Sequence, residues 1–136
     1  MKALDTNILV RYYTQDDPRQ AKIALRILKE EEALFVPRTV LIELYFVLRY
    51  GKQYHFEPAQ INAVLQHLVG LVNVTIEQAD AMETALRYHQ QGIGFADALH
   101  LASSQHCSAL LTFDDRKFAR RARQLGLKPP VTVPSA

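Results

Sequence analysis

The chain has 136 residues, of which 49% are hydrophobic and 22% charged, with a formal net charge of +2. This composition predicts one soluble globular domain, 1–136, and excludes a disordered tail or a fibre. A single cysteine, Cys107, excludes internal disulfides and a cysteine-based zinc site. No apolar stretch reaches the length of a membrane span, and the N-terminus lacks the core of a signal peptide, so we expect a cytoplasmic protein without a membrane.

Short apolar runs of strand length alternate with helical patterns along the chain. Proline starts and glycine stops mark most of the helices, and Asp17 and Thr39 are candidate N-caps. We predict strands at 2–4, 33–37, 71–76 and 109–113, an edge strand at 131–133, and helices at 18–32, 41–50, 58–69, 77–91, 93–106 and 116–126. Nearly all-apolar strands between helices indicate an α/β fold with a parallel sheet covered on both faces.

Four acids are predicted near one edge of this sheet, where open parallel sheets bind their ligands. Asp5 follows the first strand, and Asp114, with Asp115 behind it, follows the strand ALLTF. Glu43 and Asp97 lie in apolar sequence, in what we expect to be the first turns of two helices. Each has a simpler interpretation, since strand-end aspartates often cap helices, Asp97 would gain from the helix dipole, and Glu43 could point outward. Those interpretations leave the shared location unexplained.

Clustered carboxylates repel, because two unit charges ~4 Å apart interact by about 4 kcal/mol at an effective dielectric of about 20. A cation is therefore expected among them. An all-oxygen donor set without a cysteine or histidine pair favours Mg²⁺ or Mn²⁺ over zinc. Such ions support hydrolysis of phosphodiesters by activating water and neutralising charge on the phosphate. We therefore interpret Asp97 as a metal ligand.

Four segments in order, LDTNILV, LIELYFVL, FADALHLA and LLTFDDRKF, resemble the motifs of the PIN-domain ribonucleases, most closely the VapC-type toxins of toxin–antitoxin modules. The resemblance covers nearly the whole chain. It implies a three-layer α/β/α sandwich with a central parallel sheet and a Mg²⁺- or Mn²⁺-dependent endoribonuclease activity. It also implies inhibition by a cognate antitoxin protein and assembly into a homodimer. The antitoxin and the second copy of the chain would both bind the early helices, and the segment YFVLRY would contribute to this contact.

By position, the resemblance makes Asp5, Glu43, Asp97 and Asp114 the catalytic acids and metal ligands, with Asp115 as the alternative for the fourth. It also matches Thr6 and Thr112 to hydroxyls that support the acids or their water, and Asn7 to a common neighbour. A metal-activated water would attack the scissile phosphate of the RNA substrate, leaving a 5′-phosphate and a 3′-hydroxyl.

A basic cluster follows the fourth acid closely enough to lie at the rim of the site, where it would contact RNA phosphates: Arg116, Lys117, Arg120 and Arg121. A solvated helix face is the alternative interpretation of these charges. Aromatic residues at helical spacing could stack on bases, but core or interface packing is the commoner role: Tyr12, Tyr13, Tyr45, Phe46 and Tyr50.

Three other functions compete with a toxin nuclease. A PIN nuclease outside toxin–antitoxin modules would carry the same four acids, and an antitoxin gene beside this one would separate the two. A haloacid-dehalogenase-like phosphatase also places an aspartate after its first strand, but requires a second two residues later, where this chain has Asn7. A non-catalytic interaction module would be favoured by the loss of an acid, and all four are present.

Overall fold

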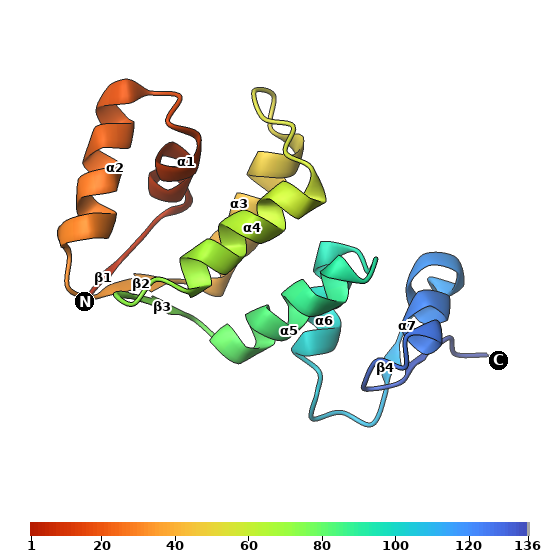
Figure 1. The fold of residues 1–136 in the computed structure, drawn as a ribbon. Coiled ribbons are helices and arrows are strands. Elements are labelled where there is room, and N and C mark those ends of the chain that lie inside the picture. The colour runs from red at the N-terminus through yellow and green to blue at the C-terminus, as the bar shows by residue number, and fades with distance from the viewer. Residues whose placement is uncertain (136) are drawn as a thin grey trace. The chain divides into compact units, whose positions relative to one another are not determined.

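The computed structural model describes residues 1–135 and divides the chain into two compact units, one at Met1–Ala79 and one from Asp80 onward (Figure 1). The first unit contains a three-stranded sheet of β1 (Lys2–Ala3), β2 (Leu34–Val36) and β3 (Val74–Ile76), in the order β1-β2-β3. All strands are parallel, with Lys2 opposite Leu34 and Leu34 opposite Val74. The carboxyl ends of the three strands therefore lie at the same edge of this sheet.

The helices of the first unit are α1 (Thr6–Thr14), α2 (Pro18–Glu30), α3 (Arg38–Tyr50) and α4 (Pro58–Val69). In Figure 1, α1 lies beside α2, and α3 lies beside α4. The predicted start of α2 is confirmed, because Asp17 Oδ1 accepts a hydrogen bond from Gln20 N at 3.0 Å. Fully buried leucines from α3 and α4, among them Leu44 and Leu65, supply much of the core.

The predicted cap of α3 is wrong. The helix begins at Arg38, and its N-cap is Pro37 rather than Thr39. The reason is a distant partner: the backbone N–H of Arg38 donates to Glu77 Oε1 at 2.8 Å, so this exposed helix end does not need a capping hydroxyl. Because the helix starts earlier, Glu43 lies in its second turn instead of its first.

The strand predicted at 71–76 is shorter in the structure, since β3 begins at Val74. Asn73 hydrogen-bonds to a helix end instead of joining the strand. Its side-chain amide donates to the carbonyls of Leu28 at 2.9 Å and Glu31 at 2.8 Å, at the C-terminal end of α2. The residue before it, Val72, is fully exposed. The first half of the predicted strand therefore serves to terminate α2.

The second unit begins at the second residue of α5 (Ala79–Gln90). It also contains α6 (Phe95–Ala102), β4 (Leu110–Leu111), a π-helical turn η1 (Asp115–Ala119), α7 (Arg120–Gln124) and β5 (Val131–Thr132). The predicted edge strand is confirmed, because β5 pairs with β4 in parallel. The predicted extension of α6 to residue 106 is wrong. Ser104 Oγ and Gln105 Nε2 donate to the carbonyls of His100 and Leu101 at 2.8 and 3.1 Å, which ends the helix.

Parallel strand pairs in both units, alternating with helices along the chain, confirm the predicted α/β class. Among residues 1–135, no helix combines the length and the apolar character that crossing a bilayer requires.

Candidate active site

The first unit holds two of the predicted acids, Asp5 and Glu43, on the wall of one cavity of about 350 Å³. Asp5 follows β1 and is the N-cap of α1, where its Oδ1 accepts a hydrogen bond from the backbone N–H of Thr6 at 2.7 Å. The Thr6 hydroxyl donates in turn to Glu43 Oε1. Both carboxylates are exposed, whereas Thr6 is only 5% exposed. Thr6 therefore links the two acids from inside the protein.

Local sequence explains why these side chains meet. The backbone N–H of Leu4 donates to the carbonyl of Phe35 at 2.9 Å, so Asp5 leaves the sheet directly at the end of β1. On α3, Leu41, Leu44 and Leu48 are fully buried, which turns Glu43 toward the opposite, open face of the helix. The simpler interpretations are both met: Asp5 caps a helix and Glu43 points outward. They do not exclude a site, since both acids face the same cavity.

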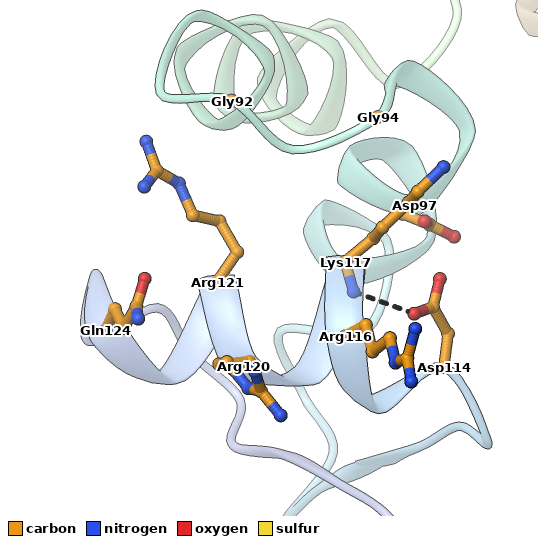
Figure 2. A pocket seen from close by; sticks show the side chains of 9 residues that line it. All are labelled: Gly92, Gly94, Asp97, Asp114, Arg116, Lys117, Arg120, Arg121 and Gln124. Atoms are coloured by element: carbon orange, nitrogen blue, oxygen red, sulfur yellow. Dashed lines mark hydrogen bonds between the residues drawn. The ribbon is translucent and has the colours of Figure 1, made fainter.

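The second unit holds the other two acids, Asp97 and Asp114, on the wall of a separate cavity of about 600 Å³. Their carboxylates face one another (Figure 2). Asp97 lies in the first turn of α6, as predicted, and is half-buried. Asp114 is the N-cap of η1, and its Oδ1 accepts hydrogen bonds from the backbone N–H groups of Lys117 at 2.9 Å and Phe118 at 3.4 Å. Capping accordingly fixes the carboxylate of Asp114 beside that of Asp97.

The Asp97 carboxyl lies in an unfavourable electrostatic position. Burial raises its pKa above the ordinary value, the negative charge of Asp114 raises it further, and only His100 acts in the opposite direction. Apart from His100, the surroundings thus disfavour the ionised form of Asp97. A cation bound between Asp97 and Asp114 would remove this penalty, as the sequence interpretation requires.

The two neighbouring aspartates after β4 have different partners. Asp115 forms ion pairs with Arg120 and Arg123, each at 3.3 Å, and does not line the cavity. Asp114 lines it, and the backbone N–H of Asp114 donates to the hydroxyl of Thr112 at 3.1 Å. These contacts favour Asp114 over Asp115 as the fourth acid.

The four cations of the basic cluster line the same cavity as Asp97 and Asp114 (Figure 2). Arg121 is the most firmly held, because its Nε and Nη2 donate to the carbonyl of Gln91 at 3.2 and 3.0 Å. Gly92 makes room for it: a Cβ there would lie 3.1 Å from Arg121 Nη2, and the φ of Gly92 is +102°. Positive charge is thereby fixed at the rim of a cavity that contains two carboxylates.

Each unit thus contributes one pair of carboxylates. Among the described residues, no third histidine, cysteine or acidic side chain joins either pair in a group that could hold a metal. The donors in both pairs are carboxylate oxygens, with the Thr6 hydroxyl beside the first pair. This chemistry suits a hard divalent cation that keeps several water ligands, and it does not suit zinc.

Three side chains that line the Asp5–Glu43 cavity were not predicted from the sequence: Arg11, Gln53 and Tyr54. Arg11 lies one helical turn after Asn7, which is a weak signal. Gln53 and Tyr54 follow Gly51 in a loop without a periodic pattern, and only tertiary structure brings them to the cavity.

Comparisons with known proteins find a matching family and similar proteins. A model of the PIN domain family matches residues 2–124. A VapC ribonuclease of Aquifex aeolicus (strain VF5) is 26% identical over 132 residues, covering 94% of both sequences. A crystal structure of VapBC2 from Rickettsia felis, bound to a DNA fragment from their promoter, aligns over 98% of both chains with a TM-score of 0.36 and 17% identity.

Proposed function

The chain belongs to the PIN domain family, and on that premise we propose that it is a metal-dependent endoribonuclease and the toxin of a toxin–antitoxin pair. The observation that carries the proposal is the carboxylate pair Asp5 and Glu43 joined through Thr6, at the carboxyl end of a parallel strand. The similarity to a protein named VapC ribonuclease supports the ribonuclease and toxin assignments.

In this proposal Asp5, Glu43, Asp97 and Asp114 are the catalytic acids and bind Mg²⁺ or Mn²⁺. When bound, such an ion activates water and neutralises charge on the phosphate. The work of the protein is to keep the four carboxylates oriented. Thr6 does so for the first pair by hydrogen bonding, and helix capping does so for Asp114. The whole chain, 1–136, then acts as a single PIN domain.

The RNA substrate would be held by the cations that line the Asp97–Asp114 cavity. These side chains reach phosphates rather than bases, so they contribute affinity without sequence preference. Their contribution should fall as salt concentration rises, since each contact to a phosphate releases bound counterions.

A cognate antitoxin and a second copy of the chain are the proposed protein partners, and the cytoplasm is the proposed location. The exposed aromatic side chains of α3 support a protein interface, with Phe46 40% and Tyr50 67% exposed. Aromatic residues are enriched at the centres of protein interfaces. Cys107 is a free cysteine, in keeping with a reducing compartment.

Cleavage of total RNA by the purified protein tests the function directly. We expect cleavage with Mg²⁺ or Mn²⁺ that EDTA abolishes, and loss of cleavage in Asp5→Asn and in Asp97→Asn. Asp115→Asn is the matched control, because this acid lies outside both cavities and should retain activity. Cleavage that survives chelation, or that both active-site variants retain, would contradict the proposal.

A further inference from the structure

The cavity of the first unit extends well beyond its two acids. Besides Asp5 and Glu43 it is lined by the apolar side chains of Val10 and Val47 and by Gln53 and Tyr54. Its volume of about 350 Å³ lies at the lower end of the range for pockets that hold small organic groups. The two valines and the Tyr54 ring form an apolar side of a cavity whose other lining residues are polar or charged. The acids account for only one part of this cavity.

Tyr54 is held in place by a polar network from the start of the chain. Its hydroxyl donates to Asp16 Oδ2 and accepts from Arg11 Nη1 at 3.2 Å. Arg11 Nη1 also contacts both carboxylate oxygens of Asp16, at 3.1 and 3.2 Å, and Arg11 Nε donates to Gln20 Oε1 at 2.8 Å. The hydrogen bond from Tyr54 lowers the pKa of Asp16, so this acceptor is ionised at neutral pH.

Gly51 allows the Tyr54 ring to approach the end of α3. A Cβ at Gly51 would lie 2.5 Å from the carbonyl oxygen of Val47 and 3.2 Å from Tyr54 Cδ2. The backbone N–H of Tyr54 donates to the carbonyl of Gly51 at 3.1 Å, which closes the turn. The ring is therefore anchored at its backbone and at its hydroxyl. A preorganised aromatic ring loses little conformational entropy when it binds a ligand.

The charges of the cavity disfavour a phosphate beside Tyr54. Asp5 and Glu43 are acidic, and the positive charge of Arg11 is already balanced by Asp16. An uncharged planar group suits an aromatic ring, two valines and the neutral amide of Gln53. Nucleobases have this character, and a fixed aromatic side chain can stack on any of them.

We propose that the Tyr54 side of this cavity binds a nucleobase of the RNA substrate, next to the phosphate that is cleaved. The base lies against the Tyr54 ring and the two valines, and the amide of Gln53 bonds to its edge. This inference rests on the proposed function. It makes Tyr54 and Gln53 contributors to base selection, and Arg11 and Asp16 positioning residues that act through Tyr54.

Steady-state cleavage of a mixed-sequence RNA, with sequencing of the new ends, tests the proposal. Tyr54→Leu removes the ring, and we expect KM to rise about 5- to 150-fold, because stacking on an aromatic side chain contributes that much to binding. Tyr54→Phe keeps the ring but removes its hydrogen bonds to Asp16 and Arg11, so its KM should rise by less than that of Tyr54→Leu. Gln53→Ala should change the base preference beside the cut. Tyr88→Leu is the matched control, since Tyr88 lies on α5 outside both cavities and should change neither quantity.

A binding measurement separates failure of this inference from failure of the proposed function. The probe is a short fluorescein-labelled single-stranded RNA, compared with the same strand carrying an abasic position, and the protein carries Asp97→Asn to prevent cleavage. We expect the abasic strand to bind more weakly, and Tyr54→Leu, but not Tyr88→Leu, to remove the difference. Thermal unfolding verifies that each variant is folded.

The outcomes are distinct. Suppose that the wild type cleaves RNA and that Tyr54→Leu matches Tyr88→Leu in KM, base preference and abasic discrimination. This result would overturn the nucleobase site and leave the nuclease standing. Absence of any cleavage, with abasic discrimination that depends on Tyr54, would overturn the nuclease and support the nucleobase site.

Discussion

Replacing Thr6 tests whether the two acids of the first unit depend on the residue that links them. Thr6→Val keeps the shape of this buried side chain and removes the hydroxyl that donates to Glu43. A hydrogen bond to a charged group contributes about 1.5–3 kcal/mol. Glu43 is exposed, so water replaces part of the loss, and the lower end of that range applies. About 1.4 kcal/mol corresponds to a tenfold change in an equilibrium constant.

We therefore expect Thr6→Val to raise the Mg²⁺ concentration for half-maximal RNA cleavage about tenfold, in line with the effect of residues that orient metal ligands. Thr6→Ser retains the hydroxyl and should stay near the wild-type value. The measurement is a Mg²⁺ titration of cleavage rate for the three proteins. Equal midpoints for the valine variant and the wild type would refute the role assigned to Thr6.

Three further predictions concern the second unit. Burial and the charge of Asp114 raise the pKa of Asp97, so ionised Asp97 destabilises the folded state at pH values above the ordinary aspartate pKa of about 3.9. In EDTA at neutral pH, Asp97→Asn should therefore melt at a higher temperature than the wild type, and the difference should shrink as the pH falls toward about 3.9. A lower melting temperature of Asp97→Asn at neutral pH would contradict this prediction. Gly92→Ala should lower the free energy of unfolding by about 1–3 kcal/mol, because alanine is strained at the φ of +102° and its Cβ would meet Arg121. A free energy of unfolding by denaturant equal to that of the wild type would contradict this prediction. Asp115→Asn removes two exposed ion pairs, so it should lower the free energy of unfolding by about 1 kcal/mol or less and leave RNA cleavage intact. Asp114→Asn should abolish RNA cleavage, because Asp114 lines the cavity. Loss of cleavage in Asp115→Asn but not in Asp114→Asn would exchange the roles of the two residues.

Local signals in the sequence correctly predicted the start of α2 and the end of α4. Asp17 and Pro18 start α2, and Gly70 ends α4, as expected, because the capping groups lie within a few residues of the backbone groups that they satisfy. Thr39 failed as a cap for the opposite reason: Glu77, 39 residues away, accepts the hydrogen bond from the N–H of Arg38. A sequence pattern does not report such a partner.

The same distinction applies to the site. All four acids were selected from their positions after strands or inside apolar helices, and in each unit two of them line one cavity. The choice between Asp114 and Asp115 depended on which one faces a cavity, and that required coordinates. Tyr54 reaches the cavity of the first unit through hydrogen bonds to residues about 40 positions earlier, so the sequence contained no local signal for it.

A Mn²⁺ titration of the purified protein, followed by calorimetry, tests the central claim that these carboxylates bind a divalent ion. We predict saturable binding to the wild type that is weakened at least tenfold in Asp5→Asn and in Asp97→Asn, and is unchanged in Asp115→Asn. Binding that is equal in all four proteins, or absent from the wild type, would contradict the account.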